Sequence, residues 1–270
     1  MREQTTPGVW LGPLVVSAVA GVKKWDLVQR EERRRVRRRW RMSISALMLS
    51  VGVAALMAAV VRPALESSRQ SRCRENLQQI GLALLQYHET HRHLPAAAIT
   101  DDRGQTLLSW RVAILPDLGR RDLYDQFRLD QPWDSPHNRA LLAKMPKVFA
   151  CPSESGHNVG ITTYRVLYGR EGPFDGAKPL FDRTRGVDLR EVLDGTNNTI
   201  MVAETGQPVP WTKPEELFFA EDKPMPRFSS RHASGFNALF ADGTVRFLKF
   251  ELQAGIVRAL ITRDGSEGFG

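Results

Sequence analysis

The sequence predicts an α+β fold in which a long N-terminal helix packs on an antiparallel sheet. After residue 72, apolar residues recur at spacings of four, three, four and three, which places them on one stripe of a helix. Segments rich in β-branched and aromatic residues follow, and the last of them has the pattern of a hairpin. A helix with one apolar stripe needs a surface to pack on, and these segments supply a sheet. The stripe consists of Cys73, Leu77, Ile80, Leu84 and Tyr87.

Residues 42–61 form an uncharged stretch of membrane-spanning length. Their sequence is MSISALMLSVGVAALMAAVV, and twenty helical residues at ~1.5 Å each cover ~30 Å, the thickness of a bilayer interior. The arginine-rich run at residues 31–41 flanks this stretch on one side only, which by the positive-inside rule places the N-terminus in the cytoplasm. We therefore expect a single-pass protein of the inner (cytoplasmic) membrane that contacts the lipid bilayer and has its C-terminal part outside. A buried core helix is the alternative interpretation.

The positive charge of the chain is concentrated before the apolar stretch. Residues 1–41 hold eleven Lys or Arg against four Asp or Glu, so +7 of the net +8 lies there and residues 42–270 carry +1. The greater part of the chain therefore has no net attraction for polyanions, and no nucleic-acid partner is predicted. The predicted organisation is a disordered basic cytoplasmic tail, the transmembrane helix, its continuation over residues 62–93, an α+β domain over 94–250 and a tail over 251–270.

Local patterns divide the α+β domain into short elements. Ser135 followed by Pro136 is a typical helix start, because Ser caps the free N–H groups and Pro fits the first turn. Gly, Pro and Asp are frequent over residues 169–190, which indicates a surface loop. Strands are predicted at residues 106–115, 161–169 and 199–204, and short helices at 121–127 and 135–144.

Two cysteines, Cys73 and Cys151, lie in the part expected outside the cytoplasm, where disulfides form. A bridge between them would close a long loop and stabilise the folded chain by ~4 kcal/mol in the chain-entropy account. The sequence leaves two interpretations open, a disulfide between Cys73 and Cys151 or two buried free thiols.

The stretch RHASGFNALFADGTVRFL, residues 231–248, is the predicted hairpin. A two-residue loop at Asp242-Gly243 would place Phe236 opposite Lys249. His232 then precedes the first strand. A lone His beside a turn is weak support for chemistry, so we expect a local hydrogen-bonding role for it and not catalysis.

Six blocks of the sequence resemble a bacterial family known as domain of unknown function 1559. The resemblance covers about residues 63–250 and implies a pilin-like architecture, similar to type II secretion pseudopilins, with no assigned catalytic activity. The blocks are CRENLQQIGLALLQYHETH, LSWRVAILPDLGRRDLYDQF, PWDSPHNRALLAKMPKVFACPSE, DGTNNTIMVAET, VPWTKPEEL and HASGFNALFADGTVRFL. By this resemblance His232, Asp242 and Gly243 form the family's terminal signature, while Cys73 and the pair Cys151-Pro152 match its two cysteine positions.

The chain departs from the family at the start of the apolar stretch. Family members usually carry a prepilin processing site, Gly-Phe-Thr-Leu-Ile-Glu, where this chain has SISALMLS, residues 43–50. The Gly before a Phe and the Glu are both absent. The Glu would neutralise the N-terminus of a neighbouring subunit during assembly, so this sequence gives less support to filament assembly than to membrane anchoring.

The first functional hypothesis is a non-enzymatic, membrane-anchored, pseudopilin-like protein whose partners are other pilin-like subunits or secretion machinery. The second is a single-span anchor that displays a protein- or glycan-binding domain, with Trp110, Trp133 and Trp211 as candidate contacts or, alternatively, as core residues.

A metal-dependent hydrolase is the third hypothesis, suggested by His88 and His91. Zinc hydrolases of the His-Glu-x-x-His type need their two histidines four residues apart, and these two are three apart. The sequence therefore predicts no enzyme, no catalytic residue, no cofactor and no metal ligand.

Overall fold

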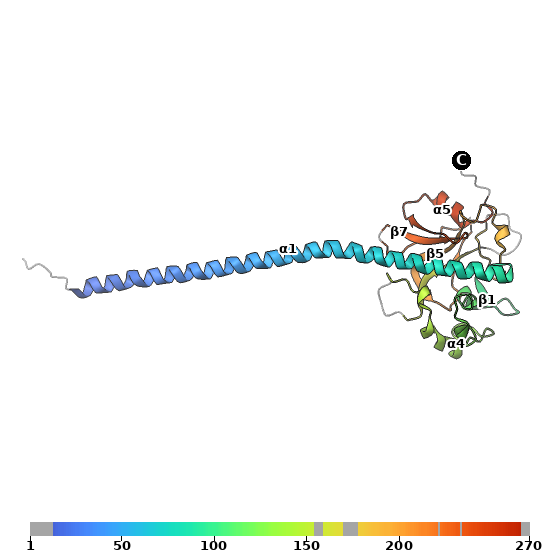
Figure 1. Ribbon diagram of the computed structural model, residues 1–270, viewed down its shortest axis with the longest axis horizontal. Coiled ribbons are helices and arrows are strands. Elements are labelled where there is room, and N and C mark those ends of the chain that lie inside the picture. The colour runs from blue at the N-terminus through green and yellow to red at the C-terminus, as the bar shows by residue number, and fades with distance from the viewer. Residues whose placement is uncertain (1–12, 154–158, 170–177, 221, 233, 266–270) are drawn as a thin grey trace, which may run out of the picture. The chain divides into compact units, whose positions relative to one another are not determined.

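The computed structural model describes residues 13–153, 159–169, 178–220, 222–232 and 234–265. The chain divides into two units, Met1–Pro63 and Ala64–Gly270. Helix α1, Pro13–His91, contributes residues to both (Figure 1). The α+β class is confirmed, since the second unit combines helices with a mainly antiparallel sheet.

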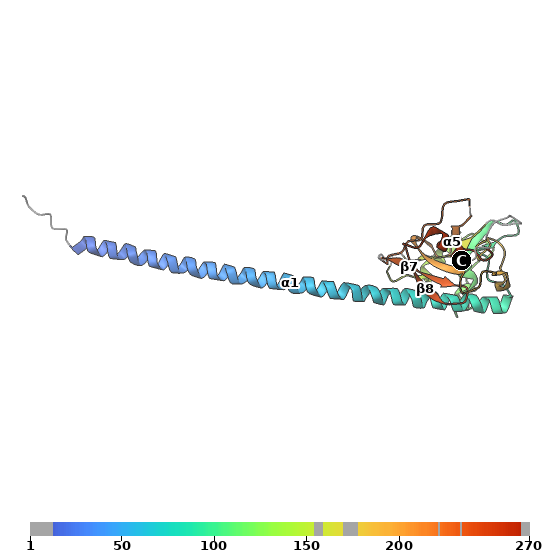
Figure 2. The same cartoon turned by 90° about the horizontal axis from the view of Figure 1, so that it is seen from above.

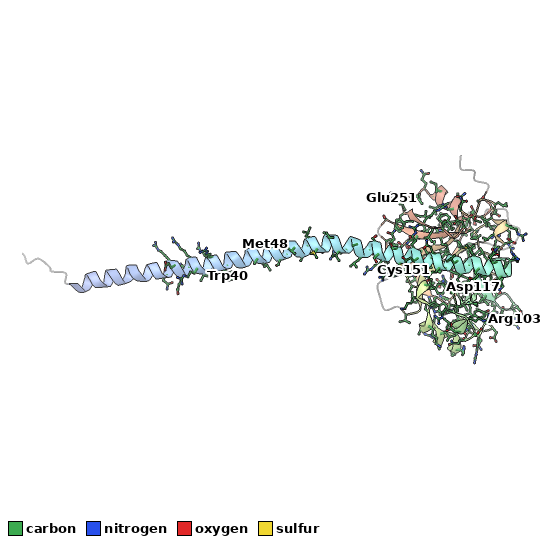
Figure 3. All side chains as sticks on the ribbon, in the orientation of Figure 1. Trp40, Met48, Arg103, Asp117, Cys151 and Glu251 are labelled. Atoms are coloured by element: carbon green, nitrogen blue, oxygen red, sulfur yellow. The ribbon has the colours of Figure 1, made fainter. Side chains whose placement is uncertain are left out.

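In the first unit, the described residues belong to α1. Residues 13–41, for which the sequence predicts a disordered tail, are helical in the structure. The α1 segment that begins at Ala46 is long and apolar enough to cross a membrane by length and composition. The large apolar side chains over residues 47–61 of this segment are exposed, as Met48 illustrates in Figure 3.

The second unit is built around a four-stranded antiparallel sheet with the order β3-β5-β7-β8. Its strands are β3 (Ile161–Arg165), β5 (Ile200–Pro210), β7 (Gly235–Phe240) and β8 (Val245–Lys249). Two smaller sheets pair β1 (Ala98–Thr100) with β2 (Thr106–Ser109), antiparallel, and β4 (Leu167–Tyr168) with β6 (Leu217–Phe218), parallel. The short helices are α2 (Trp110–Ala113), α3 (Arg121–Tyr124), α4 (Pro136–Ala140), α5 (Ala254–Ile261), η1 (Leu141–Lys144), η2 (Lys147–Phe149) and η3 (Leu189–Glu191).

The C-terminal part of α1 lies along the main sheet, as Figures 1 and 2 both show. The predicted apolar stripe is confirmed, because Cys73, Leu77, Ile80 and Leu84 are all fully buried. Gly81 lies on the contact, where an added Cβ would come 2.8 Å from Leu239 Cδ1. A glycine here therefore lets the helix approach the sheet closely.

The opposite face of the sheet forms a second hydrophobic cluster. Phe236, Ala238 and Phe240 of β7 pack there with Ile261 of α5. The residues after 250, predicted as a tail, thus include a helix that covers the sheet. Every residue of β7 is buried, because α1 lies on one face of the strand and α5 on the other.

The closing hairpin has a three-residue loop, and its predicted register was wrong by one position. Gly243 N donates to Phe240 O, and Phe240 N donates to Thr244 O, so the loop is Ala241-Asp242-Gly243. Gly243 has φ +84°, as a type I turn with a G1 bulge requires. In consequence Phe236 faces Leu248 and not Lys249.

The strand predicted at residues 106–115 was too long. Strand β2 ends at Ser109, whose side chain accepts a hydrogen bond from Arg111 N and caps α2. The predicted start at Ser135 is confirmed, since its hydroxyl accepts from Asn138 N and Pro136 occupies the first turn of α4.

A buried ion pair joins α2 to the segment before β6. Arg111 and Glu216 are 2.7 Å apart, and their side chains are 0% and 2% exposed. Arg111 also donates to Tyr164 O, and Glu216 accepts from Val166 N, so both charged groups have several partners. Burial raises the pKa of Glu216 and lowers that of Arg111, whereas the opposite charge of each partner counters these shifts.

Replacement of Glu216 by Gln should lower the free energy of unfolding by about 3–5 kcal/mol, because it leaves the buried Arg111 charge without its counter-ion. Glu215→Gln is the matched control, since Glu215 pairs with Lys213 at the surface, where such a pair contributes about 0–1 kcal/mol. Urea unfolding of the full chain in detergent measures the free energy of unfolding of both variants. Equal losses in the two variants would contradict this account.

Gly243→Val should destabilise the domain by about 1–3 kcal/mol, because the new side chain must adopt φ +84°. Its Cβ would also lie 3.2 Å from Leu85 Cδ1 of α1. Gly255→Val is the control, since an added Cβ there meets nothing within 4 Å. Thermal unfolding midpoints compare the two, and a Gly243→Val midpoint equal to that of the wild type would rule out the strained turn.

Candidate functional site

Four side chains with metal-binding or nucleophilic atoms meet where α1 crosses the sheet. They are Cys73 of α1, Cys151 after η2, Glu204 of β5 and His232 before β7. One donor atom from each lies within 4.8 Å of the donor atoms of the others. The burial of the α1 stripe brings Cys73 to this place, and the pairing of β5 with β7 brings Glu204 next to the segment that carries His232. We call these four residues the cysteine-histidine cluster.

The two cysteines of the cluster are in contact, with their Sγ atoms 2.6 Å apart. Cys73 is buried and Cys151 is half-buried, and both are free thiols in the structure. The predicted disulfide therefore remains a prediction, but the fold brings together the two residues that it requires. Figure 3 labels Cys151 beside α1.

His232 is 4% exposed and lies between two glutamates. Its Nδ1 is 2.7 Å from Glu66 Oε1, and its Nε2 is 3.6 Å from Glu204 Oε2. Nε2 is buried and has no hydrogen-bond partner among the residues that the structure describes. A buried ring nitrogen usually has a partner, so this atom needs an explanation.

Glu204 is 1% exposed and is held in place by Asn237 of β7. Its Oε2 accepts hydrogen bonds from Asn237 N at 2.8 Å and from Asn237 Nδ2 at 3.1 Å. Its Oε1 lies 4.0 Å from Cys151 Sγ. One β7 residue thus fixes the orientation of the carboxylate toward the other cluster members.

Contacts within the cluster shift the pKa values of three of its members. Contact with Cys73 lowers the pKa of Cys151 to about 6, and the same contact raises the pKa of Cys73. Polar contact with Cys151, and then with Glu204, raises the pKa of His232 to about 10. Near neutral pH the protons of the cluster therefore reside on Cys73 and His232, while Cys151 is a thiolate. A thiolate is the form of cysteine that binds metals and attacks electrophiles.

Other residues singled out in the sequence lie apart from this cluster. Asp242 caps the hairpin turn, with its Oδ1 accepting from Thr244 N and Oγ1, so His232 and Asp242 do not act as a couple. His88 Nε2 accepts a hydrogen bond from Leu189 N, which ties α1 to η3. His91 is exposed and bonds to Tyr87 O within α1. Pro152 directly follows Cys151.

One member of the cluster and two residues that contact it were not predicted from the sequence. Glu204, Glu66 and Asn237 are far apart along the chain, and no motif connects them. One signal was available, because Glu204 ends the apolar run TIMVAE. A carboxylate inside a buried strand is unusual unless it has partners.

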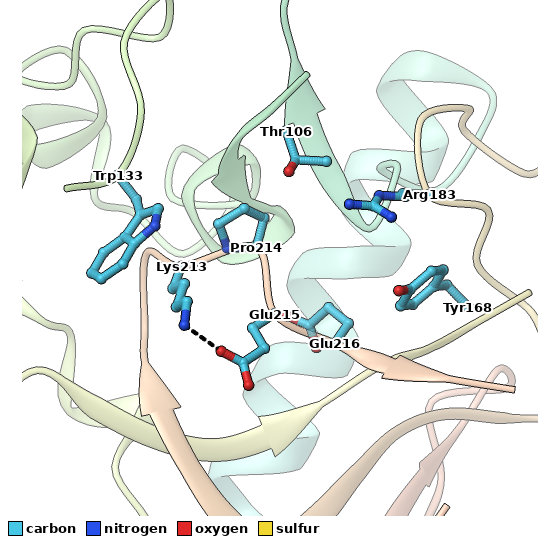
Figure 4. Close-up of a pocket in the computed structure, with 8 residues that line it drawn as sticks. All are labelled: Thr106, Trp133, Tyr168, Arg183, Lys213, Pro214, Glu215 and Glu216. Atoms are coloured by element: carbon cyan, nitrogen blue, oxygen red, sulfur yellow. Dashed lines mark ion pairs between the residues drawn. The ribbon is translucent and has the colours of Figure 1, made fainter. Parts of the chain in front are cut away.

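A separate pocket of about 320 Å³ opens at the end of the smaller sheets. Trp133 and Tyr168 line it, and the charged groups Arg183, Lys213 and Glu215 surround them (Figure 4). Lys213 Nζ lies 5.5 Å from the centre of the Trp133 ring. Of the three tryptophans considered as ligand contacts, Trp133 is half-buried and lines this pocket, whereas Trp110 and Trp211 are fully buried core residues.

Together these features define a class of protein, an α+β domain whose N-terminal helix includes a stretch of membrane-spanning length. The model of one family, described as protein of unknown function (DUF1559), matches residues 62–224. The chain therefore belongs to this family, as the resemblance predicted. Neither a curated protein nor a solved structure matches the chain. The family match includes Cys73, Cys151 and Glu204 but ends before His232.

Proposed function

We propose that this protein is a non-enzymatic, single-pass membrane protein that holds a pilin-like domain outside the cytoplasm, as a pseudopilin-like component of a secretion or surface assembly. The observation that carries the proposal is the apolar stretch of α1. Between Ala46 and Val61 its large side chains are exposed, among them Leu49 at 71% and Leu56 at 66%. Apolar surface of this extent is stable in lipid and unfavourable in water.

The charge distribution supports the orientation. Several arginines of residues 30–38 lie on the N-terminal side of the apolar stretch and are exposed, as a cytoplasmic flank would be. An N-terminus in the cytoplasm puts residues 64–270 on the other side of the membrane. Cys73 and Cys151 are in contact there, in a compartment where either oxidation or metal binding can hold them together.

The arrangement of the second unit supports the pilin-like part of the proposal. A single helix, α1, covers one face of an antiparallel sheet, and the same helix contains the apolar stretch. Residues 43–50 lack the processing Gly and the Glu of a prepilin. A processed N-terminus would then carry an unpaired charge into lipid at a cost of several kcal/mol. We therefore propose that α1 stays attached to its basic flank.

The paired substitutions Leu49→Arg and Leu56→Arg should release the chain from membranes, because each Arg near the centre of a span costs about 2.5–3.5 kcal/mol on insertion scales. Leu82→Arg is the matched control. It changes another exposed leucine of α1, 69% exposed, beyond the apolar stretch, and should leave the chain in the membrane fraction. Alkaline carbonate extraction followed by immunoblotting measures retention. Equal retention of the double variant and the wild type would refute the anchor.

A second candidate function is a stationary anchor that displays a binding domain, and the pocket at Trp133 is the observation that favours it. The pocket combines two aromatic rings with several convergent polar groups, and both kinds of group contact ligands in small-molecule sites. Its charged groups of both signs, Arg183, Lys213 and Glu215, suit a ligand rich in hydrogen-bonding groups, such as an oligosaccharide.

Titration with neutral oligosaccharides should change the tryptophan fluorescence of the wild-type chain if the pocket binds glycans. Trp133→Ala should abolish the change, since Trp110 and Trp211 are buried in the core. Leu193→Ala is a control at another exposed side chain, 77% exposed. A fluorescence change that survives Trp133→Ala, or no change with any oligosaccharide, would rule out glycan binding in this pocket.

A further inference from the structure

We propose that Cys73, Cys151, Glu204 and His232 bind one divalent metal ion of the zinc class, which fastens α1 to the sheet. The four residues offer two sulfurs, one imidazole nitrogen and one carboxylate oxygen, all within 4.8 Å of one another. Zinc favours four ligands of these types in tetrahedral sites. All four ligands come from the protein, which leaves no open position on the metal for a substrate or water. Such a site is structural, and it is compatible with a non-enzymatic protein.

The strongest support is the unpaired Nε2 of His232. Nδ1 lies 2.7 Å from a Glu66 oxygen and donates to it, so Nε2 is the ring atom that faces the cluster. Nε2 is buried, lies 3.6 Å from Glu204 Oε2 and has no hydrogen-bond partner among the described residues. A metal ion bound by the two cysteines would take the place of the ring proton at Nε2 and would give this buried nitrogen a partner.

The surrounding contacts are those that metal sites use to orient their ligands. Metal-binding histidines commonly donate the other ring N–H to a carboxylate, and ligating carboxylates accept further hydrogen bonds. Glu66 is the carboxylate beside the other ring nitrogen of His232, and Asn237 donates the further hydrogen bonds to Glu204. Neither contact involves the cysteines, so a disulfide alone gives no reason for this arrangement.

The distance between the sulfurs distinguishes the two chemistries that the cluster allows. Tetrahedral zinc with Zn–S bonds of ~2.3 Å holds its two sulfurs about 3.8 Å apart, whereas a disulfide brings them to ~2.0 Å. From the observed 2.6 Å, metal binding moves the Sγ atoms apart by about 1 Å. Rotation of the half-buried Cys151 side chain can provide this movement. A disulfide would remove both sulfur ligands and leave only His232 and Glu204 to bind a metal.

The test uses the full chain, purified in detergent without chelators. Elemental analysis should find one zinc per chain, and a thiol-modifying reagent should release it to a colorimetric zinc indicator. After zinc is removed under reducing conditions, added Co2+ should bind at the same site. Its absorption spectrum should then show the thiolate charge-transfer bands and the visible bands of tetrahedral cobalt. His232→Gln and Cys151→Ser should each lower the bound metal at least tenfold, whereas His91→Ala, at an exposed histidine of α1 outside the cluster, should not.

Two results would overturn the proposal. One is a zinc-free chain whose intact mass is lower by two hydrogens, which means that the cysteines form a disulfide. The other is a reduced, folded chain that binds neither Zn2+ nor Co2+, or that binds them equally well after Cys151→Ser and His232→Gln. If His232→Gln does not fold by circular dichroism, the wild-type Co2+ spectrum and Cys151→Ser, at a half-buried position, decide the question. None of these measurements depends on the membrane proposal.

Discussion

The close packing of the α1 stripe on the sheet is the interaction on which the rest of the second unit depends. Leu77, Ile80 and Leu84 are fully buried in the main core, and Gly81 lets the helix backbone approach Leu239 of β7. A larger residue at 81 would push the helix away from the sheet. Cys73 would then leave Cys151, and Glu66 would leave His232. The cysteine-histidine cluster therefore exists only while this contact is intact.

Buried polar groups determine how the elements around the core meet. Arg111 and Glu216 join α2 to the segment before β6. Glu204 and Asn237 join β5 to β7. Each of these groups has partners that only the native arrangement supplies, and removal of one partner leaves a buried charge or polar atom unpaired. The contact of Glu204 with Asn237 therefore opposes a shift in the pairing of β5 with β7.

The sequence predicted the features that depend on local periodicity. The stripe on α1 followed from residue spacing, and the start of α4 followed from Ser135 and Pro136. The hairpin register was missed because a Gly at φ +84° adds one residue to the loop, and a shift of one residue changes every pairing. The predicted strand ran too far, beyond Ser109, because the Ser109 side chain caps helix α2 there, and apolar periodicity does not show a cap.

The cluster could be predicted only in part. Cys73 and Cys151 were candidates for a bridge, because two cysteines in a chain suggest a pair. His232 was noticed as part of a signature, but its position at Glu204 depends on how β5 pairs with β7. Glu66 and His232 are separated by 166 residues, and only the packing of α1 brings them together. Sites built from long-range contacts of this kind require the fold.

The central claim is that α1 anchors this domain outside the cytoplasm, and lysine labelling tests it directly. The N-terminal segment contains Lys23 and Lys24, and the domain contains the exposed Lys144 and Lys249. A membrane-impermeant amine reagent is applied to intact spheroplasts, and labelled peptides are identified by mass spectrometry. The account predicts that Lys144 and Lys249 are labelled, whereas Lys23 and Lys24 react only after detergent is added. Labelling of Lys23 and Lys24 in intact spheroplasts, with Lys144 and Lys249 protected, would contradict it.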